Sequence, residues 1–144
     1  MMTSQESANL TFLALTVWRE ARGEPFHGKL GVAFSIMNRV KRPAWWGNDL
    51  QGVVFKRWQY SSMTDPKDPQ VTKWPLSGDP AWQECLEVAE MAILGAIPSP
   101  VDGADSYFDL SIPAPKWANE ENFVCAIGRL RFHDVDKDHE SVPA

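Results

Sequence analysis

The sequence predicts a single α+β domain that is mainly α-helical and carries a small antiparallel β-sheet towards its C-terminal end. Apolar residues recur at helical spacing in three long segments of the first two thirds of the chain. Aromatic and β-branched residues are instead concentrated in short runs after residue 105. With 144 residues and 44% hydrophobic composition, the chain has the size of one domain with one core, which we place at about residues 7–134.

The first two helices are predicted from apolar stripes and from the residues that bound them. The first runs from Ser7 or Asn9, one of which caps it, to Arg22, because glycine and proline follow. The second extends over residues 26–40, or begins two residues later, and stops before the next proline. Since only a short connection separates them, we expect the two helices to form a hairpin.

The middle of the chain is predicted to be less regular. Residues 49–55 have the pattern of a short helix with Asp49 or Asn48 as its N-cap. Residues 56–80 contain several prolines and polar residues without a sustained period, which favours a long loop with at most short helical pieces. Loops of this length are usually functional, so we expect this one to form the wall of a binding groove.

The last third begins with the clearest helix signal of the chain. Asp79 is an N-cap candidate followed directly by proline, and the apolar pattern continues to Gly95. Residues 106–110 and 123–133 predict the small antiparallel sheet. Residues 135–144 are charged and poor in apolar side chains, so we expect a flexible tail there.

Composition excludes several classes of function. The net charge of −5 and the isoelectric point near 5.1 argue against a nucleic-acid partner. No apolar run approaches the ~20 residues that span a bilayer, and the N-terminus lacks the pattern of an export signal, so we expect a soluble protein. The two cysteines, Cys85 and Cys125, do not form a metal or redox motif and are expected to be buried thiols.

Tryptophan is abundant, with seven residues in 144. Aromatic side chains in loops suit the flat faces of sugar rings, although each one singly is more often a packing residue. As a group they favour a carbohydrate-binding groove. Five fall in loop-like segments: Trp45, Trp46, Trp58, Trp74 and Trp117.

Metal and nucleophile chemistry find little support. The three histidines are scattered, and His-Glu-x-x-His is absent, so we predict no metal site and no cofactor. His133, near the end of a predicted strand, is the histidine that could line a site. A cysteine nucleophile would require Cys125 to meet His133, and the serines at 61 and 62 lack the Gly-x-Ser-x-Gly motif.

Carboxylate chemistry fits better, at the end of the first predicted helix. Glu20 lies beside an apolar helix face, where a carboxyl can be partly desolvated, and a glycosidase uses a carboxylic acid as its proton donor. Glu24 lies four residues later, but Pro25 biases it towards an extended backbone that would point its side chain elsewhere. A solvated helix end, neutralised by neighbouring cations, is the alternative interpretation of both carboxylates.

At this point the residues resemble a known family. The run Val17-Trp18-Arg19-Glu20-Ala21-Arg22-Gly23-Glu24-Pro25-Phe26-His27-Gly28-Lys29, followed by Met37-Asn38-Arg39-Val40, is similar to the opening of the SleB/CwlJ-like cell-wall hydrolase domain. Later segments also resemble it, including Trp58-Gln59-Tyr60-Ser61, Ala104-Asp105-Ser106-Tyr107-Phe108 and Ile127-Gly128-Arg129-Leu130-Arg131-Phe132-His133. The resemblance extends from about residue 10 to residue 133.

The resemblance implies a lysozyme-like domain that cleaves peptidoglycan between N-acetylmuramic acid and N-acetylglucosamine, with Glu20 as general acid and base. It favours a lytic transglycosylase; a hydrolytic lysozyme, an N-acetylmuramoyl-L-alanine amidase and a non-catalytic wall-binding module are the alternatives. Glu24, Asp65 and Asp105 are the candidates for a second acid. The candidates for orienting Glu20 or holding the sugar are Tyr60, Ser61 and Tyr107; Trp58 and Trp117 are candidate stacking walls, for which plain packing is the alternative.

The biological setting is predicted by analogy of architecture. A small wall-cleaving domain without a separate binding module resembles a bacteriophage endolysin. Such a protein accumulates in the host cytoplasm and reaches the wall once the inner membrane is permeabilised. We expect a monomer whose partner is bacterial peptidoglycan.

Overall fold

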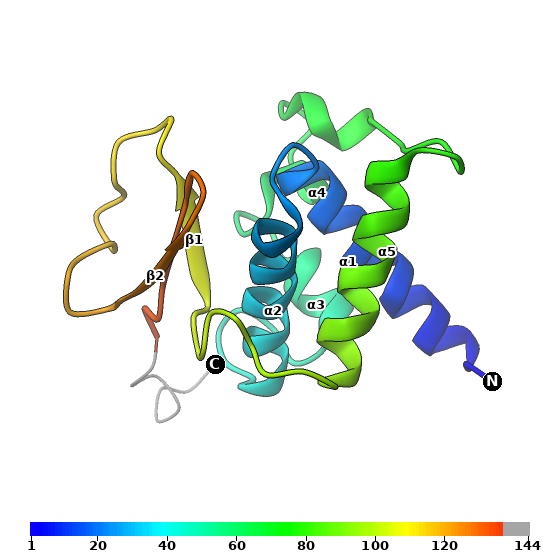
Figure 1. Cartoon of the computed structure of the whole chain (residues 1–144), viewed down its shortest axis with the longest axis horizontal. Coiled ribbons are helices and arrows are strands. Elements are labelled where there is room, and N and C mark those ends of the chain that lie inside the picture. The colour runs from blue at the N-terminus through cyan, green and yellow to red at the C-terminus, as the bar shows by residue number, and fades with distance from the viewer. Residues whose placement is uncertain (137–144) are drawn as a thin grey trace.

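A layer of helices and a three-stranded sheet lie side by side, with α2 next to the sheet (Figure 1). The computed structural model describes residues 1–136. The helices are α1 (Ser4–Ala21), α2 (Phe26–Lys41), α3 (Leu50–Val54), α4 (Ser61–Thr64), the 3-10 helix η1 (Pro69–Thr72) and α5 (Pro80–Leu94). The strands are β1 (Ser106–Asp109), β2 (Phe123–Ile127) and β3 (Leu130–His133). The predicted fold class, mainly helical with a small antiparallel sheet, is confirmed.

Helix α1 begins one turn earlier than its sequence pattern predicts. The cap is Thr3, and not Ser7 or Asn9. The Thr3 hydroxyl accepts the Glu6 N–H at 3.1 Å, and the Glu6 carboxylate accepts the Thr3 N–H at 3.0 Å. This reciprocal capping box satisfies two otherwise free donors, so it extends the helix beyond the apolar stripe that the prediction followed.

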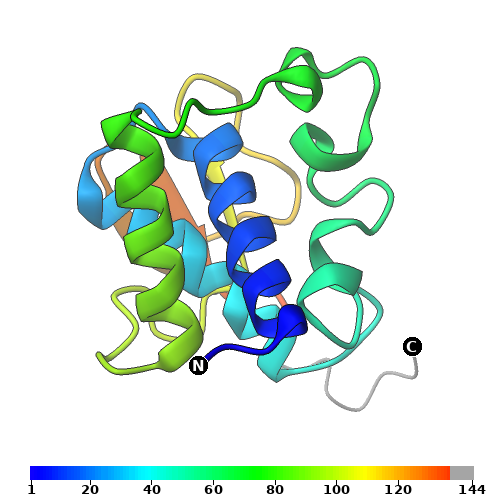
Figure 2. The same ribbon diagram turned by 90° about the vertical axis from the view of Figure 1, so that its right-hand side faces the viewer.

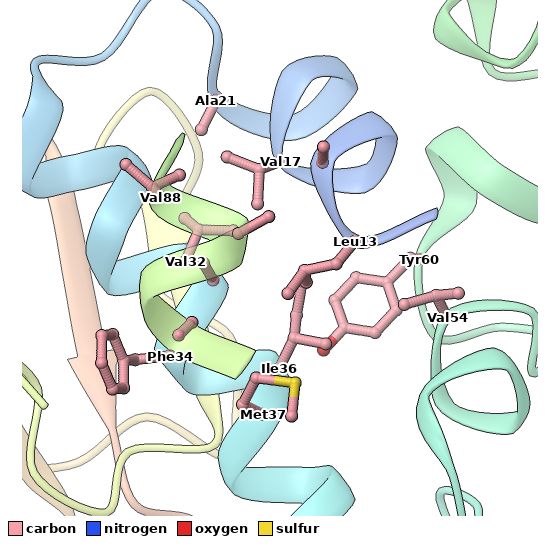
Figure 3. Packing of buried hydrophobic residues seen from close by; sticks show 14 of the residues in the cluster. Leu13, Val17, Ala21, Val32, Phe34, Ile36, Met37, Val54, Tyr60 and Val88 are labelled. Carbon is pink, nitrogen blue, oxygen red and sulfur yellow. The ribbon is translucent and has the colours of Figure 1, made fainter. Parts of the chain in front are cut away.

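The core lies where α1, α2 and α5 meet. Leu13 and Val17 of α1, Val32 of α2 and Val88 of α5 are fully buried and face one another (Figure 3). Tyr60, which comes from the segment before α4, also enters this cluster, near Leu13. Each such side chain contributes about 1.5–3 kcal/mol through burial, so the three helices hold one another in place.

The predicted loop over residues 56–80 contains two short helices, α4 and η1, and runs beside α1 (Figure 2). Ser61 begins α4, and the Asp68 carboxylate caps η1 by accepting the Gln70 N–H at 2.8 Å. Because these pieces are only four residues long, they produce no apolar period in the sequence. The prediction of an irregular segment with short elements is confirmed.

The sheet has the strand order β1-β3-β2 and is antiparallel throughout. Phe132 of β3 is completely buried and pairs in register with Tyr107 of β1. Gly31 of α2 lies against Phe132, because a Cβ built on Gly31 would come within 2.8 Å of the phenyl ring. The glycine therefore allows the sheet to approach α2 closely, which brings β1 to the helical layer.

The residues after β3 are bonded to the domain. The carboxylate of Asp105 accepts the N–H groups of Val135 at 2.9 Å and of Asp136 at 3.0 Å, and Asp136 is buried. The expected flexible tail therefore does not begin at residue 135; the remainder of that prediction, residues 137–144 with His139, lies outside the described residues. Within residues 1–136, none of the helices has both the length and the apolar character needed to cross a bilayer.

Candidate active site

An open cleft of about 260 Å³ lies where the C-terminal end of α1, helix α2, the segment before α4 and strand β1 meet. Its lining combines carboxyl groups with several aromatic side chains. The lining residues are Glu20, Arg39, Trp45, Trp58, Gln59, Tyr60, Asp105, Ser106, Tyr107 and Trp117. Six of these residues are among the catalytic or supporting residues that the sequence predicts: Glu20, Trp58, Tyr60, Asp105, Tyr107 and Trp117.

Glu20 occupies the last turn of α1 and is partly exposed to the cleft. Its Oε2 atom accepts a hydrogen bond from the Ser62 hydroxyl at 2.6 Å. Its Oε1 atom accepts a hydrogen bond from the Tyr107 hydroxyl. Two hydroxyls from segments far apart in the sequence, one on α4 and one on β1, therefore hold the carboxyl group in a single orientation.

Tyr107 is suited to remain a neutral partner of this carboxyl. Burial raises the pKa of Tyr107 well above 10, and the charge of the Glu20 carboxylate raises it further. The phenol therefore keeps its proton at any physiological pH. A neutral hydroxyl can donate to an ionised carboxylate or accept from a protonated acid, which allows it to hold Glu20 in both states.

Ser62 is held in turn by Arg19, the residue before Glu20. The Arg19 guanidinium is buried, donates to the carbonyl oxygens of Ser62 and Lys73, both at 3.1 Å, and lies 4.7 Å from the centre of the Trp74 ring. Burial lowers the pKa of Arg19, but a guanidinium remains charged in proteins. Consecutive residues of α1 thus supply the carboxyl and the group that fixes its serine partner.

The sequence analysis selected Ser61 in place of Ser62, and the structure corrects this choice. The exposed Ser61 hydroxyl donates to Asp68 at 2.6 Å, whereas the buried Ser62 hydroxyl donates to Glu20. Successive side chains on a helix point about 100° apart, so only one of two adjacent serines can face Glu20. The sequence shows two adjacent serines, but a helix of four residues has no apolar period that tells which of them points towards Glu20.

Arg39 of α2 lines the cleft and is not among the site residues predicted from the sequence. Its guanidinium donates to Gln59 Oε1 at 2.6 Å, to the Asp105 carbonyl at 2.7 Å and to the Ser106 hydroxyl at 3.2 Å. These bonds tie α2 to the segment before α4 and to the start of β1. The Met37-Asn38-Arg39-Val40 motif was the available signal, but it carried no indication of what the arginine contacts.

Asp105 lines the cleft but is a structural residue rather than a second acid. Its side chain is 1% exposed. Its Oδ1 atom accepts from the Ser106 hydroxyl at 2.9 Å, in addition to the two N–H groups that it holds after β3. Arg42 lies 3.8 Å from Oδ2. With both oxygens occupied, this carboxylate connects the end of β3 to the start of β1.

The other two carboxylates proposed as second acids lie outside the cleft. The Oε1 atom of Glu24 is buried next to Gly28 and Gly128, where a Cβ built on either glycine would come within 3.7 Å of it, and it has no hydrogen-bond partner within residues 1–136. Asp65 lines a separate cavity. In the part of the chain that the structure describes, Glu20 is thus the cleft carboxylate whose oxygens contact hydroxyls alone.

The predicted tryptophans separate into two groups. Trp58 is 80% exposed and Trp45 is 43% exposed, and both project into the cleft; Trp117 lines it from the loop before β2. Trp46 is instead a core residue whose ring N–H donates to the Arg39 and Arg42 carbonyls, which corrects its expected exposure. The exposed rings can stack on the faces of sugar residues.

His133 does not line the cleft, contrary to its selection from the sequence. The ring is buried against Phe108, with centroids 5.8 Å apart, and its Nδ1 atom lies 2.7 Å from the Asn122 side-chain oxygen. Burial lowers the pKa of His133. Over residues 1–136, no three side chains of the types that bind metal ions gather at one place.

Comparisons with known proteins give the chain a family. The cell wall hydrolase family model matches residues 23–133, so Glu20 lies just before the matched segment. The spore cortex-lytic enzyme of Bacillus subtilis is 28% identical over 126 residues, and that of Bacillus cereus is 31% identical over the same length. Both alignments cover 86% of this chain but only 37% and 43% of the relatives, so the chain spans less than half of their length.

Two solved structures share the fold. The catalytic domain of the Bacillus cereus SleB protein superimposes with a TM-score of 0.67 at 26% identity, over 88% of this chain and 90% of that one. The catalytic domain of the germination-specific lytic transglycosylase SleB from Bacillus anthracis gives 0.69 at 25% identity, over 92% and 99%. Together with the sequence match over residues 23–133, these likenesses show that the chain belongs to the cell wall hydrolase family.

Proposed function

We propose that this protein degrades peptidoglycan as a lytic transglycosylase, with Glu20 as the acid and base that breaks the bond between N-acetylmuramic acid and N-acetylglucosamine. The observation that carries the proposal is the position of Glu20, which faces an open cleft between the hydroxyls of Ser62 and Tyr107. Family membership and the name of the SleB relative, a lytic transglycosylase, support the same chemistry.

The reaction uses one carboxyl group twice. Protonated Glu20 donates its proton to the bridging oxygen, the bond from that oxygen to C1 of muramic acid breaks, and the ring acquires oxocarbenium character. The resulting carboxylate takes the proton of the C6 hydroxyl of the same sugar, and that oxygen forms a bond to C1. The products are a 1,6-anhydro ring and a free sugar end, no water is consumed, and Glu20 regains its proton.

The arrangement of carboxylates favours this route over hydrolysis. A retaining glycosidase requires a second carboxyl about 5–5.5 Å from the first, and an inverting one requires a carboxylate that activates water. Asp105 is the other carboxylate lining the cleft, and its oxygens are occupied by N–H groups and a hydroxyl. A mechanism in which the substrate supplies its own nucleophile needs no such residue.

The test is digestion of purified peptidoglycan with the wild-type protein and with Glu20→Gln, followed by mass spectrometry of the soluble products. Anhydro-muropeptides from the wild type, and a loss of at least 1,000-fold in Glu20→Gln, are the expected result, since the amide cannot donate a proton. Glu24→Gln is the matched control, because it removes a carboxylate of the same segment outside the cleft.

The products also distinguish the alternatives. Reducing-end products heavier by one water, about 18 Da, identify a lysozyme. Free peptides from intact glycan identify an amidase, and binding without any product identifies a wall-binding module. Full activity of Glu20→Gln refutes the assignment of Glu20 whatever the products are.

The biological setting is a separate proposal. By analogy with endolysins, we propose that the protein is a bacteriophage enzyme that acts as a monomer and reaches the wall from the host cytoplasm after the inner membrane is permeabilised. Expression in a bacterial host without and with a membrane-permeabilising agent tests this. Lysis that depends on the agent supports the proposal, and export with lysis in its absence contradicts it.

A further inference from the structure

A second cavity adjoins the cleft. It has a volume of about 360 Å³ and is lined by Arg57, Trp58 and residues 64–67, which precede η1. Trp58 also lines the cleft, so its side chain is a common wall of the two cavities. A substrate strand bound in the cleft would therefore lie next to this second cavity, which we call the basic pocket.

The basic pocket carries two cations without carboxylate partners. Within the described part of the chain, neither the Arg57 guanidinium nor the Lys67 amine forms a hydrogen bond or an ion pair, and both residues are exposed. Arg57 stacks instead on Trp58, 4.6 Å from the ring centre. The carboxylate of Asp65 also lines the pocket, and it accepts the backbone N–H of Lys67, not its side-chain amine, at 2.9 Å. A net positive pocket is unusual on a chain with a net charge of −5.

Trp58, the wall between the two cavities, is held in an unfavourable backbone conformation. Trp58 has φ +71°, a region that a bulky side chain seldom adopts. The next residue, Gln59, fixes this conformation, because its amide donates to the carbonyls of Val53 at 2.7 Å and Trp46 at 3.1 Å. Strain of this kind persists where function requires it. Here it leaves an exposed indole between the cleft and the two cations.

We propose that the basic pocket binds a carboxylate of the stem peptide that is attached to the muramic acid residue in the cleft. This inference rests on the proposed function. Each muramic acid of peptidoglycan carries a short acidic peptide on its lactyl group, and an arginine beside a lysine suits a carboxylate. Two to three peptide residues reach roughly 7–10 Å, so a peptide that begins at a sugar in the cleft can pass Trp58 and enter the pocket.

A second source offers the same chemistry. Where the peptide has been removed, the lactyl group of muramic acid ends in a carboxylate of its own. The two sources differ in their distance from the sugar ring, and a pair of substrates separates them. Intact peptidoglycan carries the peptide carboxylates, and the same material after treatment with an amidase carries the lactyl carboxylates alone.

The experiment compares the double variant Arg57→Gln/Lys67→Gln with the wild type on both substrates. Lys41→Gln/Lys56→Gln is the matched control, since it removes the same charge from exposed residues outside both cavities. We expect kcat/KM of the pocket variant to fall about tenfold on intact peptidoglycan, because a change of this size corresponds to the loss of one charge-assisted hydrogen bond. On the stripped glycan it equals that of the wild type.

A loss confined to the stripped glycan would assign the pocket to the lactyl carboxylate, and an equal loss on both substrates would show that the pocket does not recognise the peptide; either result would overturn the peptide assignment. No loss on either substrate, or an equal loss in the control variant, would refute the pocket as a carboxylate site. Co-sedimentation provides a measurement that does not depend on catalysis. The Glu20→Gln protein should bind intact peptidoglycan more tightly than stripped glycan, and the pocket changes should abolish that difference.

Failure of the proposed function is recognised separately. If the wild type releases no anhydro products from either substrate, the transglycosylase assignment is wrong. The co-sedimentation result still decides whether the basic pocket binds the peptide-bearing wall, because equal binding to both materials would refute it.

Discussion

At the scale of the residue, the character of Glu20 depends on having hydroxyls rather than a cation as its partners. A lysine or arginine in contact with the carboxyl would favour the ionised form and oppose its role as an acid. Ser62 and Tyr107 can reverse the direction of their hydrogen bonds when Glu20 gains or loses its proton. In the proposed mechanism they are therefore positioning residues that serve both halves of the reaction.

Ser62→Ala and Tyr107→Phe each remove one of these hydroxyls. We expect kcat to fall about tenfold or more in each variant, since a hydrogen bond to a charged group contributes roughly 1.5–3 kcal/mol, while KM changes little. Steady-state turnover of solubilised peptidoglycan measures both quantities. Ser61→Ala is the control, because its hydroxyl contacts Asp68 outside the cleft. A loss in Ser61→Ala as large as that in Ser62→Ala would show that the serine partner was misassigned.

At the scale of the element, the contact of Ser62 with Glu20 depends on how the segment from α4 to η1 is attached to α1. Arg19 makes that attachment through the carbonyls of Ser62 and Lys73. Asp79 adds to it by accepting the ring N–H of Trp18 at 3.1 Å while it caps α5. The segment has few apolar residues of its own, so these polar contacts to α1 determine where Ser62 lies relative to Glu20.

Arg19→Met is expected to loosen this segment. It leaves two backbone carbonyls without a donor, at a cost of about 1–3 kcal/mol each if they stay buried, and it frees Ser62 to move away from Glu20. Faster hydrogen exchange over residues 61–74, together with about a tenfold loss of kcat, would be the signature. Arg22→Met is the control, since its guanidinium stacks on Trp18, 4.2 Å from the ring centre, and donates to the Trp18 carbonyl rather than to the segment from α4 to η1. Unchanged exchange in Arg19→Met would contradict this role.

At the scale of the whole molecule, burial of ionisable groups next to the site couples stability to alkaline pH. Burial raises the pKa of Tyr60 from its ordinary value of 10 to about 12, and it raises the pKa of Tyr107 in the same direction. Below pH 10 both tyrosines are protonated in the folded and unfolded states, so their ionisation takes nothing from the free energy of unfolding. Above pH 10 the unfolded chain loses protons that the folded protein retains, and stability falls as pH rises.

We therefore expect the free energy of unfolding to decrease between pH 10 and pH 12, with roughly 2–3 kcal/mol of the loss due to Tyr60. Urea unfolding at pH 8, 10 and 11 measures it. The Tyr60→Phe variant should lose less stability over this range than the wild type. Cys85, whose pKa burial also raises to about 12, contributes equally to both proteins. Parallel curves for the two proteins would contradict the prediction.

The sequence by itself determined the features that depend on local chemistry. The extents of α2 and α5 follow from apolar period and caps, and a small antiparallel sheet after residue 105 follows from aromatic and β-branched runs. Glu20 also followed, because an acidic residue at the end of an apolar helix is a local pattern. Short elements such as α4 have no period, and this is why Ser61 was selected rather than Ser62.

Only the tertiary structure decided which side chains meet. Tyr107 and Ser62 approach Glu20 from segments that are 87 and 42 residues away in sequence. Asp105 became a structural group because the chain returns past it after β3. Hydrogen bonds between distant residues depend on how the layers are packed, and local propensity carries no information about them. The candidate carboxyl was thus legible in the sequence, and the hydroxyls that hold it were not.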